Sequence, residues 1–196
     1  MKVLIACEYS GRVRDAFAAK GHIAVSCDIL PTEREGMHHQ GDIRDILYNG
    51  WDLLIAFPPC TYLCSSGLHW NKKRPGRAQQ TEQALQFVQL LMEAPIERIA
   101  LENPVGCIST RIRKFDQRIQ PYQFGHDASK QTCLWLKGLP LLAPTQYIEP
   151  RIIDGKPRWG NQTDSGQNRL APSPTRAKER SLTYQGIADA MADQWR

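Results

Sequence analysis

The sequence has no apolar run that approaches the roughly 20 residues needed to cross a bilayer. Its first residues, MKVLIACEYSG, reach charged side chains too early for a secretory signal, so we expect a soluble intracellular protein without membrane contact. The paired cysteine spacing of a structural metal site is also missing. The six cysteines are scattered, and only Cys60, Cys64 and His69 could form half of a zinc site. We expect reduced thiols and no bound metal.

The chain also lacks internal repeats and the G-x-G-x-x-G fingerprint, which argues against a nicotinamide cofactor. With 196 residues, 41% of them apolar, it can bury the core of one domain covering residues 1–196. The net charge of +5 is moderate, but basic residues gather in HWNKKRPGR and RLAPSPTRAKER. Such runs are commonly solvated loops. Because the first run closely follows Cys60, an anionic substrate is favoured.

Strand-like apolar runs alternate with segments of helical periodicity. The expected strands cover residues 2–7, 22–29, 51–57, 98–101 and 131–136, and the expected helices cover 13–20, 77–94 and 183–195. This alternation predicts an α/β fold with a doubly wound, mostly parallel sheet. Between residues 140 and 180, six prolines interrupt any periodicity, so we expect a Pro-rich basic loop rather than a second domain.

Ligand-binding groups are expected at the carboxyl ends of the parallel strands. Gly11 follows the first strand at the start of a helix, where backbone N–H groups are free to meet a ligand. Asp28 closes the second strand, where a carboxylate can accept the hydroxyl hydrogens of a ribose or simply cap a turn. Asp42 could cap its own turn or accept a hydrogen bond from an adenine amino group. Together, Gly11 and Asp28 favour an adenosine-type cofactor.

The third expected strand runs into Pro58 and Pro59, which lack N–H donors and force the chain to turn. Cys60 therefore stands on a rigid corner at the end of a strand. Its thiol could be a buried apolar group, but the turn exposes it, and nearby basic residues favour the nucleophilic thiolate. The next strand ends in Glu102 and Asn103, which we expect beside Cys60. Glu102 could be an ordinary surface acid, or a proton donor to a substrate that the thiol attacks.

These motifs, in this order, resemble those of the DNA cytosine-5 methyltransferases over most of the chain. FPPC is similar to the family's Pro-Cys nucleophile motif, ENP to its Glu-Asn motif, ACEYSG to its cofactor segment and GDI to its Asp-Ile adenine contact. YQFGHDASKQTCLWL lies at the position of the Gln-x-Arg-x-Arg strand, and TYQGIADAMADQ resembles the last motif. The resemblance implies a Rossmann-like sheet of the S-adenosylmethionine-dependent methyltransferase type. It assigns S-adenosylmethionine binding to Glu8, Tyr9, Ser10, Gly11, Asp28, Ile29, Asp42, Ile43, Pro59, Thr183 and Tyr184.

The resemblance also implies methyl transfer to C5 of cytosine in DNA through a covalent Cys60 adduct. Because C5 is not nucleophilic, the thiolate adds to C6, while Glu102 protonates or hydrogen-bonds N3 and Lys130 assists near the exocyclic oxygen. A duplex substrate requires base flipping, which a single strand or a free nucleotide avoids. CSSGLHWNKKRPGR is expected to be a mobile loop that closes over the base. Substrate contacts are assigned to Ser65, Ser66, Lys72, Lys73, Arg74, Asn103, Arg176 and Arg180.

The chain departs from the family's pattern in several places. Of the Gly-rich first motif only Gly11 remains, Lys130 stands for an arginine pair, and FPPC has an additional proline. Only about 40 residues of Pro-rich loop occupy the place of a target-recognition domain, far short of a typical domain. We therefore expect a compact, phage-type relative in the cytoplasm of a bacterium or of a phage-infected host cell.

Two other functions fit the same residues. One is transfer of another one-carbon or two-carbon group to a free pyrimidine nucleotide, and the other is an inactive relative that only binds nucleic acid. An amino-directed methyltransferase would also carry a double proline at this corner. That class needs an acidic acceptor before the prolines and an aromatic ring after them, where this chain has Phe57 and Cys60.

Overall fold

A computed structural model describes residues 1–173 and 175–196, so that Pro174 of the expected Pro-rich loop lies outside the described residues. Its centre is a seven-stranded sheet with the order β3-β2-β1-β4-β5-β7-β6. The strands are β1 (Lys2–Ala6), β2 (Ile23–Asp28), β3 (His38–Gln40), β4 (Leu53–Ala56), β5 (Arg98–Asn103), β6 (Gln117–Ile119) and β7 (Thr132–Lys137). Strands β3, β2, β1, β4 and β5 run parallel, and β7 runs antiparallel to both β5 and β6. The predicted α/β fold with a mostly parallel sheet is confirmed.

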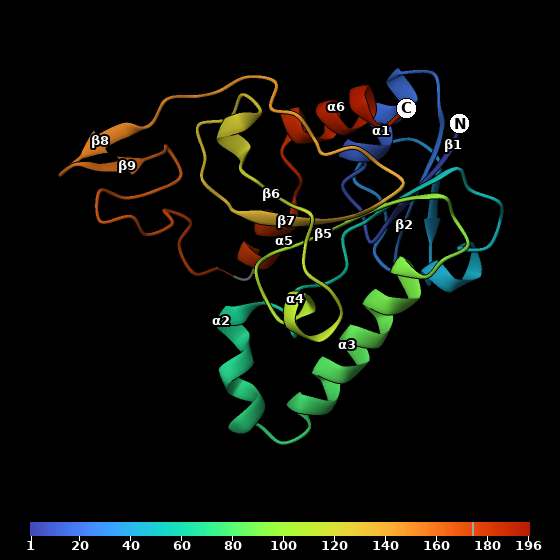
Figure 1. The fold of residues 1–196 in the computed structure, drawn as a ribbon, viewed down its shortest axis with the longest axis horizontal. Helices are drawn as coiled ribbons and strands as arrows, with labels where there is room; N and C mark the ends of the chain where they lie inside the picture. The colour runs from blue at the N-terminus through green and yellow to red at the C-terminus, as the bar shows by residue number, and fades with distance from the viewer. Residues whose placement is uncertain (174) are drawn as a thin grey trace.

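Helices cover both faces of this sheet. Figure 1 shows α1 (Arg12–Ala19) and α6 (Gln185–Gln194) together on one face and α3 (Arg77–Met92) on the other. Alternate residues of β1 supply the two cores: Val3 and Ile5 pack with α1 and α6, whereas Leu4 and Ala6 pack with α3. All four residues of β4 are buried. A strand that is apolar on both faces has to be covered on both, which is why the sheet is doubly wound.

The order of the strands reverses at β1. The chain passes outward from β1 to β2 and β3, then returns to place β4 on the other side of β1. The loops that leave the carboxyl ends of β1 and β4 therefore diverge, and the crevice between them is the usual ligand site of an open α/β sheet. The segments at this crevice are residues 7–11 and 57–60, which include the cysteine corner.

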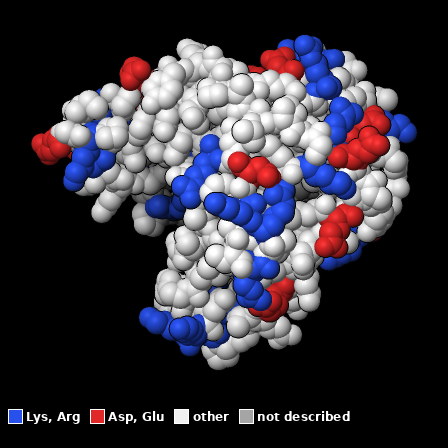
Figure 2. All heavy atoms as spheres, in the orientation of Figure 1, with Lys and Arg blue, Asp and Glu red and all other residues white. Residues whose placement is uncertain are grey.

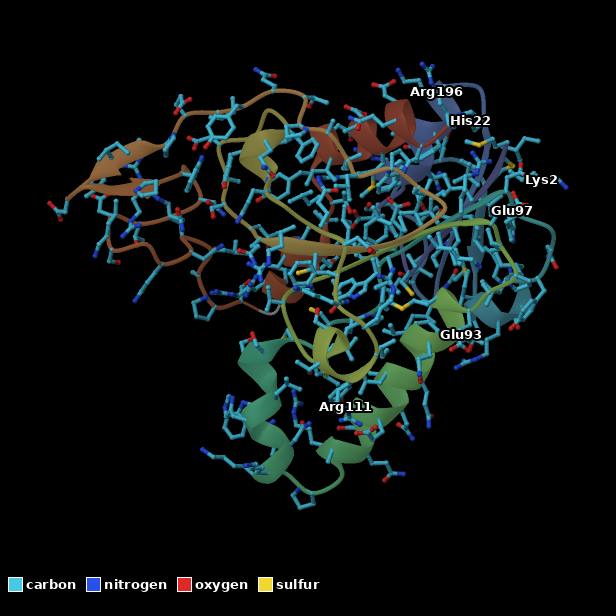
Figure 3. All side chains as sticks on the ribbon, in the orientation of Figure 1. Lys2, His22, Glu93, Glu97, Arg111 and Arg196 are labelled. Carbon is cyan, nitrogen blue, oxygen red and sulfur yellow. The ribbon has the colours of Figure 1, made fainter. Side chains whose placement is uncertain are left out.

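Several short elements complete the chain. They are η1 (Ile43–Asp45), α2 (Ser65–Leu68), η2 (His69–Lys72), α4 (Ile108–Arg111), η3 (Pro121–Gln123), β8 (Arg151–Ile153), β9 (Lys156–Arg158) and α5 (Arg176–Ser181). Arg111 of α4 forms an ion pair of 2.9 Å with Glu82 of α3, and Figure 3 shows Arg111 directed toward that helix. None of the helices in the described residues is both long and apolar enough to cross a membrane.

The structure corrects the expectation for residues 64–77. This stretch, expected as a mobile loop, contains the short helices α2 and η2 and leads into α3. Arg77 donates a hydrogen bond of 2.9 Å to the carbonyl of Thr61, and its guanidinium lies 4.9 Å from the centre of the Tyr62 ring. These contacts hold the end of the segment against Thr61 and Tyr62, which directly follow Cys60. A sequence with no helical periodicity of its own is ordered here by packing on α3.

The Pro-rich region from 140 to 180 is more structured than expected. It contains α5 and a hairpin of β8 and β9 that projects from the body (Figure 1). The hairpin turns at Asp154 and Gly155, which have φ values of 49° and 70°. An Asp-Gly pair with positive φ at both positions is the favoured two-residue hairpin turn, so the sequence did contain a signal for it.

Candidate active site

The cysteine corner is held by backbone hydrogen bonds at the end of β4. The carbonyl of Cys60 accepts from the N–H groups of Leu63 and Cys64 at 3.0 and 2.9 Å. Asn103, at the end of β5, donates from Nδ2 to the carbonyl of Pro58 at 2.7 Å. Because β4 and β5 pair in parallel, the ends of the two strands lie side by side and this bond joins them. The expected neighbourhood of Cys60 and the Glu102–Asn103 pair is present.

The loops that follow β4 and β5 are also joined to each other. The N–H of Ser65 donates to Val105 at 3.0 Å, and the N–H of Cys107 donates to Leu63 at 2.9 Å. Gly106 lies between these bonds, where an added Cβ would stand 1.9 Å from the carbonyl oxygen of Leu63. Only glycine allows this approach. The cysteine corner is therefore fixed by the neighbouring loop as well as by its own prolines.

Cys60 and Glu102 line the same cavity, which we call the Cys60 cavity. Its walls are formed by Cys7, Glu8, Tyr9, Ser10, Phe57, Pro58, Pro59, Cys60, Glu102, Asn103, Pro104, Lys130, Arg180, Ser181, Leu182 and Thr183. Burial raises the pKa of Glu102, and the Lys130 ammonium opposes this rise only in part. A carboxyl with a raised pKa retains its proton more readily, so Glu102 is suited to donate a hydrogen bond into the cavity.

The surroundings of Cys60 favour the protonated form of its thiol. Burial raises its pKa, and Cys64 and Glu102 raise it further, while Lys130 lowers it. This corrects the expectation that neighbouring basic residues favour the thiolate. Residues 72–74 line a separate hollow with residues 71, 75, 76, 78 and 79, and none of them lines the Cys60 cavity. Lys130 does line it, and its Nζ donates to the carbonyl of Arg180 at 2.7 Å.

A larger cavity, the Asp28 cavity, adjoins the first at Cys60. Its volume of about 640 Å³ lies in the range of roughly 300–1,000 Å³ that is typical of small-molecule sites. It is lined by Cys7, Tyr9, Cys27, Asp28, Ile29, Leu30, Gly41, Asp42, Ile43, Phe57, Pro59, Cys60, Thr61, Cys64, Ser66, Phe87, Pro104, Lys130, Arg180 and Ser181. The carboxyl ends of β1, β2 and β4 thus open into one space, with Cys60 at its junction with Glu102.

Asp28 and Asp42 differ in how many of their carboxylate oxygens accept hydrogen bonds from described residues. Oδ1 of Asp28 accepts from the N–H of Leu30 at 2.9 Å, and no described residue donates to its Oδ2. Burial raises the pKa of Asp28. Asp42 caps η1, because its Oδ1 accepts from the N–H of Arg44 at 2.9 Å and its Oδ2 from the Arg44 guanidinium at 2.7 Å. The capping role of Asp42 is therefore present, and its contact with adenine stays a prediction.

The start of α1 corrects a second expectation. Glu8 is only 5% exposed, and its Oε1 accepts from the N–H of Val13 at 2.8 Å and from the hydroxyl of Ser10 at 2.9 Å. Its Oε2 accepts from the N–H of Arg14 at 3.4 Å. The N–H groups expected to meet a ligand are thus occupied by a side chain of the protein. Gly11, the N-cap of α1, has a φ of 72° and no side chain to fill this role itself.

The segment from α5 to α6 lies across the two cavities. The hydroxyl of Tyr9 donates to the carbonyl of Lys178 at 3.0 Å, and the Arg12 guanidinium donates to the carbonyl of Thr183 at 2.9 Å. Tyr184 lines a small third cavity together with Glu102 and Lys130. The structure therefore brings the predicted residues of the first and last motifs together, although they are about 170 residues apart in the sequence.

Some predicted substrate residues lie elsewhere. Ser66 and Arg180 line the Asp28 cavity, but Ser65 and the cluster at 72–74 do not line either cavity. Arg176 donates to the carbonyl of Leu170 and is also outside both walls. In the part of the chain that the structure describes, no three histidine, cysteine or acidic side chains form a group that could hold a metal ion. The roles of these residues with a substrate stay predictions.

No protein-family model matches the chain, and no curated protein matches it in sequence. Solved structures with some similarity include the S. pombe Dnmt2 methyltransferase, at 18% identity and a TM-score of 0.45 over 69% of this chain and 48% of that chain. Another is the 16S rRNA methylase RmtB, at 11% identity and a TM-score of 0.37 over 69% of this chain and 55% of that chain. This chain therefore spans about half the length of each. The function has to be inferred from the site itself.

Several residues at the site were not predicted from the sequence, among them Cys7, Phe57 and Thr132. Cys7, with a φ of 58°, lines both cavities at the end of β1. Phe57 lies between the cavities, and Thr132 lies against Glu102. A signal for Thr132 was available, because it follows Lys130 by two positions in a strand-like run, and alternate residues of a strand share a face. Cys7 and Phe57 are the last apolar residues before their loops. That position in the sequence does not indicate a role at the site.

Proposed function

We propose that the protein is an S-adenosylmethionine-dependent methyltransferase that modifies C5 of cytosine in DNA through a covalent Cys60 adduct. One observation carries the proposal: Cys60 and Glu102 line one cavity, and Cys60 also lines a second one together with Asp28. A nucleophile, an acid and a site for an adenosine-type ligand thus meet at the switch point of the sheet.

The residues present fit S-adenosylmethionine. No described residue donates a hydrogen bond to Oδ2 of Asp28, so this oxygen is available for ribose hydroxyls. Ile29 and Ile43 offer apolar contact to an adenine. Glu8 occupies the N–H groups of α1 that would otherwise attract a phosphate, which favours a cofactor without a pyrophosphate. When bound, this cofactor supplies an electrophilic methyl group on a sulfonium.

The side chains of the Cys60 cavity can activate a cytosine ring. After the thiol of Cys60 has given its proton to a water molecule, its sulfur adds to C6, which makes C5 a nucleophile. Glu102 holds a proton for N3, where negative charge develops, and its raised pKa keeps that proton available. Lys130 is within the same cavity and can approach the exocyclic oxygen. A water molecule then takes the hydrogen of C5 as a proton, the C5–H electron pair forms the C5=C6 bond, and the Cys60 sulfur leaves as a thiolate, which restores the ring.

A nucleic-acid substrate is supported by the charge around the site. No acidic residue occurs between Asp52 and Glu82, whereas Lys72, Lys73 and Arg74 are exposed in that stretch. Figure 1 shows the segment of α2 and η2 and the β8–β9 hairpin as two projections on the same side of the molecule, and Figure 2 shows basic atoms on both projections and in the notch between them. Such a distribution suits phosphates on either side of a target base.

Nucleoside mass spectrometry of DNA and RNA from cells with and without the expressed chain tests the proposal. We expect 5-methylcytosine in DNA only when the chain is present. The mark in RNA alone would overturn the DNA assignment, and a different modified pyrimidine would favour the alternative group transfer. Binding of S-adenosylmethionine without any modified nucleoside would favour a relative that only binds nucleic acid.

The role of Asp28 can be measured separately. Replacing Asp28 by asparagine keeps the side-chain size but removes the charge that strengthens hydrogen bonds to ribose hydroxyls. We expect S-adenosylmethionine to bind about tenfold more weakly by isothermal titration calorimetry. Asp193→Asn is the matched control, because Asp193 is on α6 and pairs with Lys20 away from both cavities. Equal affinities of Asp28→Asn and wild type would remove Asp28 from the cofactor site.

A further inference from the structure

Thr132 is the hydrogen-bond partner of the acid in the Cys60 cavity. It is the first residue of β7 and only 5% exposed, and its hydroxyl donates to Oε1 of Glu102. The antiparallel pairing of β5 and β7 sets Glu102 opposite Leu134 and Asn103 opposite Cys133, which fixes where Thr132 lies. The contact is therefore determined by the register of two buried strands.

No other described residue hydrogen-bonds the Glu102 carboxyl. The titratable groups that act on it are Lys130, Cys60 and Cys133, and the Lys130 ammonium donates to the carbonyl of Arg180. Among the described residues, Thr132 in turn makes no second side-chain hydrogen bond. Thr132 is buried, and its one side-chain partner is the partly buried acid Glu102, so the orientation of the hydroxyl is defined, because without that partner it would have no side-chain hydrogen bond.

We propose that Thr132 is a positioning residue that determines which oxygen of Glu102 carries the proton. This rests on the proposed function. A hydroxyl that donates to Oε1 makes Oε1 the acceptor of the neutral carboxyl, so the proton resides on Oε2. Oε2 is then the oxygen that faces N3 of the pyrimidine.

The proton transfer balances with the addition of the nucleophile. The Cys60 thiol first gives its proton to a water molecule. As the resulting thiolate sulfur bonds to C6, the C5=C6 pair becomes a C4=C5 bond and the C4=N3 pair takes the proton from Oε2. Glu102 is left as a carboxylate, and the hydroxyl of Thr132 stabilises that charge by donating to it. The reverse movement returns the proton to Oε2 when the sulfur is eliminated.

The test uses the full chain without cofactor or substrate. Protein labelled with ¹³C at the glutamate side-chain carboxyl is titrated by NMR, and the Glu102 signal is assigned by its absence in Glu102→Gln. In Thr132→Val, which removes the donor at nearly constant volume, we expect the pKa of Glu102 to rise by about one unit, because the carboxylate loses its hydrogen bond. Thr132→Ser is expected to restore the wild-type titration. Thr110→Val is the matched control, since its hydroxyl donates to Cys107 in α4, outside the cavities.

An unchanged Glu102 titration in Thr132→Val would overturn the proposal. If Thr132→Val does not fold, the Glu102 titration is measured in Thr132→Ala, where an unchanged titration would have the same meaning. A Thr132→Ser variant that does not restore the wild-type titration would also contradict the proposal. Where methyl transfer is measurable, kcat in Thr132→Val should fall about tenfold with little change in KM, and the alkaline limb of its pH profile should move upward. A shifted titration in a chain that modifies no cytosine would leave the positioning role intact and contradict the proposed function alone.

Discussion

Replacing Cys60 by alanine is expected to lower methyl transfer by at least about 10⁴-fold, because the variant lacks the sulfur that forms the bond to C6 in the proposed mechanism. Transfer of a labelled methyl group to cytosine-containing DNA measures the loss. A second readout is the covalent adduct with DNA whose target cytosine carries, at C5, a substituent that cannot leave as a proton. Wild-type protein should be trapped as an adduct that survives denaturation, and Cys60→Ala should not.

The control for this experiment is another thiol. Cys107 is buried at the start of α4 and lines neither cavity, although its loop is joined to the cysteine corner. Cys107→Ala should therefore retain both transfer and trapping, with some loss of stability. Methyl transfer by Cys60→Ala at the wild-type rate would exclude a covalent mechanism. Equal losses in both variants would point to damage of the corner instead of loss of a nucleophile.

Replacing Glu102 by glutamine is expected to slow transfer by about 10²- to 10³-fold without destabilising the protein. Gln cannot give a proton to N3, but it keeps the size of the side chain. Burial raises the pKa of Glu102 above its ordinary value of 4.5, so the folded state favours the neutral acid. A group of this kind contributes stability below its unfolded pKa, and the contribution is lost as the pH rises through the folded pKa.

The measurement is the thermal unfolding of the wild type and of Glu102→Gln at a series of pH values from 4 upward. At pH 4 the wild type and Glu102→Gln should have similar Tm values, and above the ordinary pKa of 4.5 the variant should become progressively the more stable of the two. A wild type that gains on the variant as the pH rises would show that the Lys130 ammonium outweighs burial. A variant with full activity would remove Glu102 from the chemistry.

The sequence by itself determined where the chemistry could be. Pro58 and Pro59 cannot continue a central strand, so the chain had to turn at Cys60 whatever the rest of the fold. Apolar runs separated by helical periodicity required a sheet covered on both faces, which in turn set the strand ends at one edge. Asp28, Cys60 and Glu102 were predicted as site residues in this way, because a strand end is a local property of the chain.

Only the tertiary structure decided which groups meet at that edge. The antiparallel direction of β7 depends on pairing with β5, and it places Thr132 against Glu102. Glu8 caps α1 because Gly11 has no side chain to do so, and this removes the expected N–H groups from the ligand. The cations at 72–74 line a hollow apart from the Cys60 cavity because η2 packs on α3. Strand register, burial and helix packing act between residues far apart in the chain, so no local pattern of side chains contains them.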